Sequence, residues 1–74
     1  MSLEIVESTI HKLHLKVLTA TGLRRENATP QYLQTICRTS TLLERDLIEY
    51  IVKGNIVQES TKTKVAELRR FACS

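Results

Sequence analysis

Aromatic residues, glycine and proline are all scarce in this sequence. Aromatic residues make up 4% of the 74 residues, tryptophan is absent, and there are two glycines and one proline. A β-sheet domain usually has aromatic and β-branched residues in alternation, and many turns marked by glycine or proline. Here the few glycines and the proline divide the chain into about three segments that are too long for strands. We therefore expect an all-α fold.

Long hydrophobic runs and paired cysteine motifs are also missing. Charged side chains such as Glu7 and Lys12 interrupt the apolar stretch at the start, so we expect neither a signal peptide nor a membrane span there. The two cysteines, Cys37 and Cys73, lie far apart and form no CxxC motif. This pattern favours reduced thiols, with a disulfide as the alternative. We therefore expect a cytoplasmic protein.

The length allows a single small domain over residues 1–74. A chain of this length buries only about 60 to 65% of the surface that its unfolded form exposes, so its core is thin. Dimerisation or a partner protein can then supply much of the effective stability.

A heptad pattern of apolar residues covers the first segment. Its positions are Leu3, Val6, Ile10, Leu13, Val17 and Ala20. Ser2 is suited to cap the start of a helix, and Gly22 is suited to end it. The pattern predicts a first helix over about 3–22.

A polar loop separates this segment from a second heptad pattern. Its positions are Leu33, Ile36, Ser40, Leu43, Leu47 and Tyr50. Thr29 followed by Pro30 is typical of a helix start, and Gly54 is typical of a helix end. We predict a second helix over about 30–53. Two patterns of equal length and a short connection indicate an antiparallel two-helix hairpin.

The last segment predicts a short third helix over about 61–72. Ser60 or Thr61 can cap it. The residues expected to face inward are Val65, Leu68, and Phe71 or Ala72.

Several apolar side chains broaden the two helical faces beyond what one hairpin can bury. We expect them to need cover from the third helix, from a second copy of the chain or from another protein. The predicted partner-binding residues are Ile5, Leu15, Leu18, Tyr32, Leu33, Ile36, Leu47, Ile48, Ile51 and Val52. The expected function is a non-enzymatic helical protein–protein interaction module, with homodimerisation left open.

No residue pattern indicates a catalytic, metal or cofactor site. His11 and His14 lie near each other on the first helix but lack a third metal ligand. We expect them on a solvated surface, with a metal site or a pH-responsive contact as alternatives. Neither a nucleophile with a nearby base nor a glycine-rich phosphate loop is present. We therefore predict no enzyme activity and no cofactor.

Basic residues in the C-terminal segment suggest an alternative function. The formal net charge is +3, and the excess leans toward residues 55–74. The candidate nucleic-acid-binding residues are Lys62, Lys64, Arg69 and Arg70. The alternative is a small dimeric DNA- or RNA-binding transcriptional regulator.

The second segment also resembles a known family. The matching residues are Gln31, Tyr32, Leu43, Leu47 and Ile51. Residues 26–55 resemble the second half of the small YscE/SsaE-like co-chaperones of type III secretion systems, in which a Gln-Tyr pair opens the second helix of a hairpin. The resemblance implies a cytoplasmic co-chaperone that joins a tetratricopeptide-type chaperone to hold a secretion-needle subunit unpolymerised. The chain departs from that family in its shorter first helix and in its tail, residues 55–74.

Overall fold

The computed structural model of the chain describes residues 2–74. It contains three α-helices, α1 (Leu3–Thr21), α2 (Pro30–Val52) and α3 (Glu59–Ala72), and a single turn of 3₁₀ helix, η1 (Arg25–Asn27). No strand occurs among these residues, so the expected all-α fold is confirmed. The first two helices end within one residue of the predicted positions, and α3 begins two residues earlier than predicted.

Local signals fix the ends of α1 and α2. The side chains of Ser2 and Thr29 each accept a hydrogen bond from the backbone N–H three residues further on, at 3.3 and 3.1 Å. Pro30 occupies the first turn of α2, where its missing N–H costs nothing. Gly22 ends α1 in the left-handed conformation, with φ of 66°, which glycine adopts without strain. These capping predictions are confirmed.

The start of α3 is stabilised by a residue far away in the sequence. The prediction that Ser60 or Thr61 caps this helix is wrong, because α3 already begins at Glu59. The N-cap residue, Gln58, makes no side-chain capping bond. Its backbone N–H instead donates to the carboxylate of Glu7 in α1, at 3.2 Å. A carboxylate at this position also interacts favourably with the positive end of the helix dipole.

All three helices contribute to one continuous core. The cluster near the 53–58 connection comprises Val6, Ile10, Leu43, Leu47, Val57 and Val65. The cluster near the other end comprises Val17, Ile36, Leu68, Phe71 and Ala72. Leu13 of α1 is half-buried and packs against both clusters. The core is therefore closed only when α3 packs on both other helices.

The helical periodicity identifies most of these inward-facing residues. Ala20 is an exception, because it is exposed although it falls on the heptad pattern. His14 and Thr21 are buried on the same helix instead. The inward face of α1 is therefore rotated away from Ala20 toward α3 at this end of the helix.

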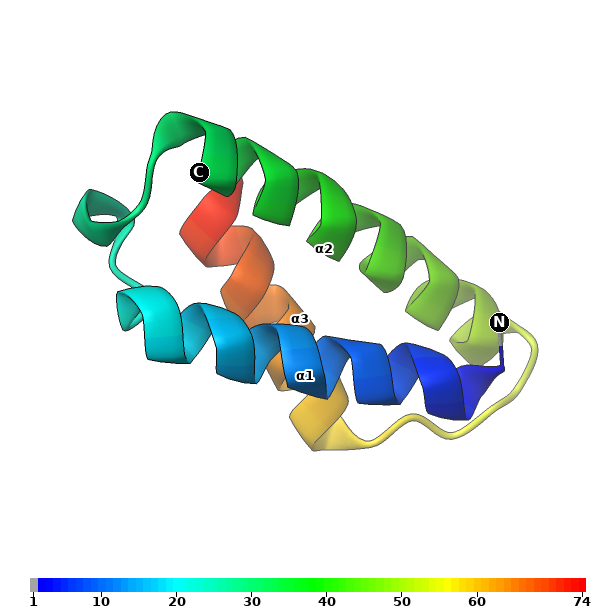
Figure 1. Cartoon of the computed structure of the whole chain (residues 1–74). Helices are drawn as coiled ribbons and strands as arrows, with labels where there is room; N and C mark the ends of the chain where they lie inside the picture. Colours follow the sequence, from blue (N-terminus) through cyan, green and yellow to red (C-terminus); the bar gives the residue numbers. More distant parts are fainter. Residues whose placement is uncertain (1) are drawn as a thin grey trace.

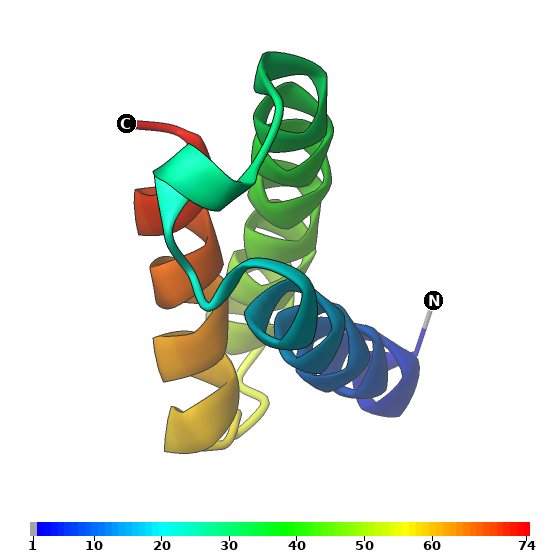
Figure 2. The same ribbon diagram turned by 60° about the vertical axis from the view of Figure 1, so that its left-hand side comes forward.

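The helices are arranged so that α3 covers one side of the other two. Figure 1 shows α1 and α2 close together near residue 2 and further apart toward the connection between them, with α3 behind. Figure 2 shows that no helix lies on the opposite side. The molecule is elongated, with principal extents of 38 × 18 × 17 Å.

Replacing a core side chain of α3 tests this arrangement. Leu68 has no exposed surface, so Leu68→Ala should lower the free energy of unfolding by about 2 to 5 kcal/mol. Ile56, which is 94% exposed, provides the matched control. Ile56→Ala should change the free energy of unfolding by less than about 0.5 kcal/mol. Urea unfolding followed by circular dichroism measures both values. Equal stabilities of the two variants would contradict the position of α3.

Candidate functional site

Many large hydrophobic side chains remain exposed after the core has formed. They are Ile5, Leu15, Leu18, Leu42, Ile48, Ile51, Val52 and Ile56. Their exposed fractions range from 41% to 94%. Single exposed hydrophobic residues are common on protein surfaces, so only those that lie together suggest a binding site.

Three of the exposed side chains lie together near the end of α2. We refer to Ile48, Ile51 and Val52 as the α2 patch; their exposed fractions are 51%, 41% and 80%. Ile48 and Ile51 also line a depression of about 200 Å³ between α2 and α3, together with Lys62 and Val65. The patch therefore combines protruding apolar side chains with a shallow apolar hollow beside them.

The predicted partner-binding residues divide into three groups. Ile5, Leu15, Leu18, Ile48, Ile51 and Val52 are exposed, whereas Tyr32 and Leu33 are half-buried against the core. Ile36 and Leu47 are core residues with 5% and 2% exposure, so the folded chain does not offer them to a partner. The reason is that both lie at the centre of the inward face of α2.

Two exposed hydrophobic residues were not predicted as contacts. Leu42, which is 47% exposed, lies beside the heptad position Leu43, and Ile56 lies in the connection between α2 and α3. Leu42 could have been found, because it falls outside the heptad pattern just as Ile5 does. No periodicity applies to Ile56.

The four candidate nucleic-acid-binding residues do not form a free basic surface. Lys62 forms an ion pair with a glutamate of its own helix at 3.1 Å, and Arg69 forms one with a glutamate of α2 at 2.7 Å. The ammonium group of Lys64 donates to a histidine ring of α1 at 2.9 Å. Arg70 is the one member of this set without either an ion pair or a side-chain hydrogen bond to residues 2–74. Two of these four charges are therefore neutralised by carboxylates within the fold.

The two histidines lie between α1 and α3, so the prediction that they are solvated surface residues is wrong. His14 is 9% exposed, and its Nε2–H donates to Glu67 Oε1 at 2.9 Å. His11 is half-buried. Within residues 2–74, no three His, Cys, Asp or Glu side chains are grouped so that they could hold a metal ion.

A chain of hydrogen bonds runs through His11 across this helix pair. The ammonium group of Lys64 donates to His11 Nδ1 at 2.9 Å, and His11 Nε2–H donates to Thr61 Oγ1 at 3.0 Å. The Thr61 hydroxyl then donates to Glu7 Oε2, also at 3.0 Å. In this network, each donor faces an acceptor and each acceptor faces a donor. The network therefore holds α1 and α3 in one register.

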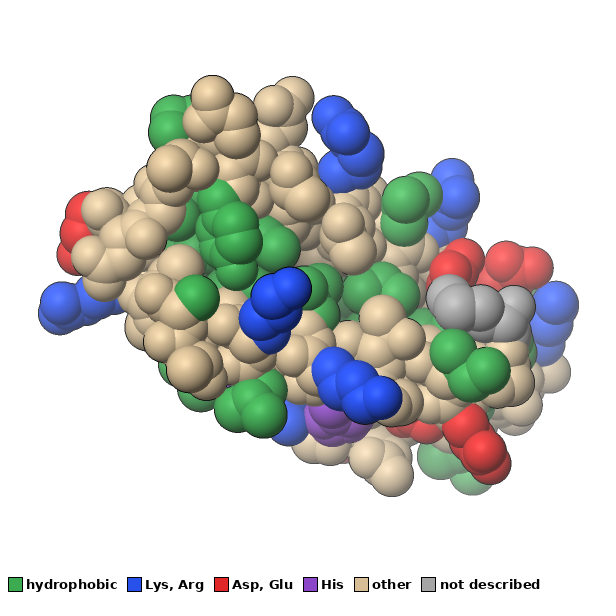
Figure 3. Space-filling model, viewed as in Figure 1, with side chains coloured by type: hydrophobic (Ala, Val, Ile, Leu, Met, Phe, Trp, Pro, Cys, Tyr) green, Lys and Arg blue, Asp and Glu red, His purple; other side chains and the backbone are tan. Residues whose placement is uncertain are grey.

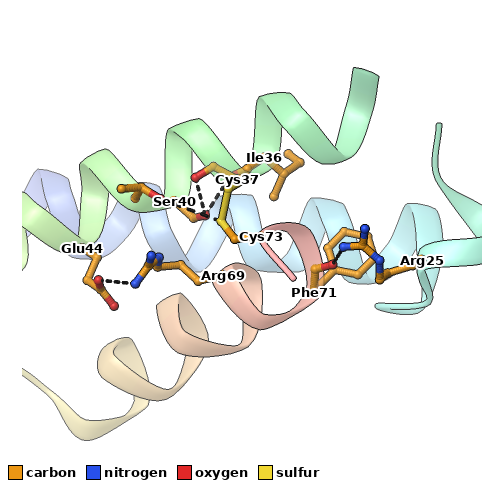
Figure 4. Close-up of a disulfide and its surroundings, with 9 residues drawn as sticks. Arg25, Ile36, Cys37, Ser40, Glu44, Arg69, Phe71 and Cys73 are labelled. Atoms are coloured by element: carbon orange, nitrogen blue, oxygen red, sulfur yellow. Dashed lines mark hydrogen bonds and ion pairs between the residues drawn. A yellow bond between two sulfur atoms is a disulfide. The ribbon is translucent and has the colours of Figure 1, made fainter. Parts of the chain in front are cut away.

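The cysteines form a disulfide that ties the end of α3 to α2 (Figure 4). The prediction of reduced thiols is wrong for this structure, because helix packing brings Cys37 and Cys73 to a Cα–Cα distance of 5.0 Å despite a sequence separation of 36. A second contact holds the same end, since the guanidinium of Arg25 donates to the carbonyl oxygen of Phe71 at 2.6 Å. The last turn of α3 is therefore fixed to both of its neighbouring segments.

Comparison of the chain with protein-family models, curated proteins and solved structures finds no match. Within residues 2–74, none of the helices combines the length and the hydropathy that crossing a membrane requires.

Removal of one hydroxyl tests whether the hydrogen-bond network between α1 and α3 contributes to stability. Thr61 is fully buried, so Thr61→Val should leave His11 Nε2–H without an acceptor, remove one of the two donors to Glu7 Oε2, and lower the free energy of unfolding by about 1 to 3 kcal/mol. The control is Thr63→Val, an exposed position on the same helix, which should change it by less than about 0.5 kcal/mol. Urea unfolding compares the two. A Thr61→Val variant as stable as the control would show that the network contributes no stability.

Reduction tests the contribution of the disulfide. Because the bond joins residues 36 positions apart, dithiothreitol should lower the free energy of unfolding by about 4 kcal/mol. The double variant Cys37→Ser/Cys73→Ser should match the reduced chain and should not respond to dithiothreitol. Urea unfolding measures stability, and a thiol assay measures oxidation. Two free thiols in the folded, air-exposed chain would contradict the pairing.

Proposed function

We propose that this chain is a non-enzymatic protein–protein interaction module that binds a helical partner through the α2 patch. The observation that carries this proposal is that Ile48, Ile51 and Val52 remain 41% to 80% exposed although three helices have closed a core. The third helix was also expected to cover such side chains, but α3 uses its own apolar residues to close the core. A separate protein, or a second copy of the chain, is the remaining source of cover.

The free energy gained by burying the α2 patch is large enough to contribute substantially to the affinity of a specific complex. Burying the exposed parts of its three side chains contributes about 3 to 5 kcal/mol, before ordering costs are subtracted. An apolar stripe of a partner helix can lie along α2 and place a side chain in the hollow between α2 and α3. Contacts around this centre then complete the interface.

The more specific form of the proposal is a co-chaperone of the YscE/SsaE-like kind. In this form α1 and α2 act as the antiparallel hairpin, and the partners are a tetratricopeptide-type chaperone and a secretion-needle subunit. The resemblance at Gln31 and Tyr32 supports it, since both residues lie in the first turn of α2. When neither of these partners is present, we propose that two copies of the chain form a homodimer through the same apolar surface.

A cytoplasmic location is part of this co-chaperone proposal. Thiols are kept reduced in the cytoplasm, so the Cys37–Cys73 bond would be open there. The end of α3 would then be held by Arg25 and by core packing. The proposal therefore requires that the dithiol form still folds and binds.

The test is capture of a partner by the tagged chain after co-expression with the products of neighbouring genes. Ile48→Asp/Ile51→Asp should reduce capture at least about tenfold, because charge then replaces apolar contact. Thr63→Asp, at an exposed position of α3, should leave capture unchanged. Capture by the unaltered chain should persist between about 50 and 300 mM salt and in the presence of dithiothreitol.

Circular dichroism checks that both variants are folded, and light scattering reports whether the captured species is a homodimer. Full capture by a folded Ile48→Asp/Ile51→Asp variant would refute the α2 patch as the binding surface. Capture that falls steeply with salt would instead favour binding through charged groups.

A further inference from the structure

The side of α1 and α2 that α3 does not cover carries basic residues along both helices. Lys12 and Lys16 of α1 lie one turn apart, and Arg38 and Arg45 of α2 lie two turns apart. All four are exposed, and none forms an ion pair or hydrogen bond with residues 2–74. Figure 3 shows basic side chains over both helices, with hydrophobic side chains between them. We refer to this side as the open face.

The strip between the two helices is apolar. Leu13 of α1 and Tyr32 of α2 are half-buried in this strip, so part of each side chain remains exposed to solvent. At the wide end, Tyr32, Ala20 and Ala28 line a depression of about 250 Å³ whose walls are mostly apolar. Leu42, exposed on α2, borders the same side. The open face is therefore an apolar furrow at its wide end and its centre, with basic residues along both helices, and its narrow end is polar.

The acidic groups near this face lie toward its narrow end. Asp46 and Glu49 lie at the narrow end of the furrow, and Glu49 already forms an ion pair with Lys53 at 3.3 Å. Most other basic side chains are engaged within the fold, as described for Lys62 and Arg69. Away from the narrow end, Lys12, Lys16 and Arg38 therefore carry positive charge that no acidic group of residues 2–74 pairs with, in a chain whose net charge is +3.

We propose that the open face binds an amphipathic helix of a partner protein, whose apolar stripe is flanked on both sides by acidic residues. The apolar stripe would cover Leu13 and Tyr32, while the acidic flanks would face the lysines of α1 and the arginines of α2. Such a helix completes a four-helix bundle with α1, α2 and α3. The molecule is 38 Å long, so a helix that stops short of Asp46 and Glu49 at the narrow end has fewer than about 25 residues.

The shape of the face selects a helix over other acidic partners. A nucleic acid presents phosphates and would leave the apolar strip uncovered. A membrane surface takes up apolar side chains that protrude beyond the basic ones, whereas Leu13 and Tyr32 are recessed between the two helices. A helix about 10 Å wide with acidic flanks satisfies both the apolar strip and the charged edges.

This inference rests on the proposed function as an interaction module, but it uses a surface separate from the α2 patch. Ile48 and Ile51 line the hollow between α2 and α3, whereas the open face lies on the α1 side of α2. The chain can therefore contact two helices at once.

The test uses two designed helical peptides with the same apolar stripe, one flanked by glutamates and the other by lysines. Fluorescence anisotropy measures their binding to the full chain. The glutamate-flanked peptide should bind at least about tenfold more tightly, and this difference should shrink as salt is raised. Equal affinities of the two peptides would overturn the proposal, as would full competition by a DNA duplex or by anionic lipid vesicles.

Charge-reversal variants locate the binding site. Lys12→Glu/Lys16→Glu should weaken binding of the glutamate-flanked peptide about tenfold or more. The control is Arg70→Glu, which removes an exposed, unpaired basic residue on α3 and should change the affinity less than about twofold. The first variant reverses two charges and the control reverses one. A fold-change in the double variant no larger than the square of the control's fold-change would show that only overall charge matters, and would overturn the proposal.

A third variant separates this inference from the proposed function. Ile48→Asp/Ile51→Asp should leave peptide binding within about twofold of the unaltered chain, because it changes only the α2 patch. If peptide binding is lost in this variant, the peptide occupies the α2 patch and the open face is the wrong site. If neither peptide binds while partner capture through the α2 patch persists, the inference fails and the proposed function stands.

Discussion

The fold depends on the insertion of Leu68 and its neighbours on α3 against the apolar faces of both other helices. Leu68 has no exposed surface, and each of the two core clusters contains residues of all three helices. A chain of 74 residues buries only a small core, so a large share of its apolar surface stays outside that core. The inward faces are therefore fully used, and the apolar side chains on other faces of α1 and α2 have no cover within the chain.

Polar contacts and a disulfide around this core join α3 to both other helices and to the segment that follows α1. The hydrogen bonds from Lys64 through His11 to Thr61 hold α1 against α3, and the contacts at Cys73 and Arg25 hold the last turn of α3. A preformed surface loses less conformational entropy on binding than one that must first become ordered. On our proposal, the α2 patch and the open face bind helices without rearrangement of the chain.

The sequence predicts what depends on neighbouring residues and misses what depends on distant ones. Periodicity and capping residues identify the three helices and most inward-facing side chains, and they leave Ile48, Ile51 and Val52 outside the core pattern. The same periodicity does not say which side of α1 meets α3, so the positions of His11 and His14 were missed. The Glu7 contact to Gln58 and the cysteine pair join residues 51 and 36 positions apart, and no local pattern encodes them.

The central claim is that α3 belongs to one cooperative core with α1 and α2 in the isolated chain, so that the remaining apolar surface is free for partners. Amide hydrogen exchange measured by NMR tests it most directly. If the core is cooperative, the amides of Val65 and Leu68 in α3 should exchange with the same free energy of opening as those of Val17 and Leu43. Rapid exchange throughout α3, with α1 and α2 still protected, would contradict it.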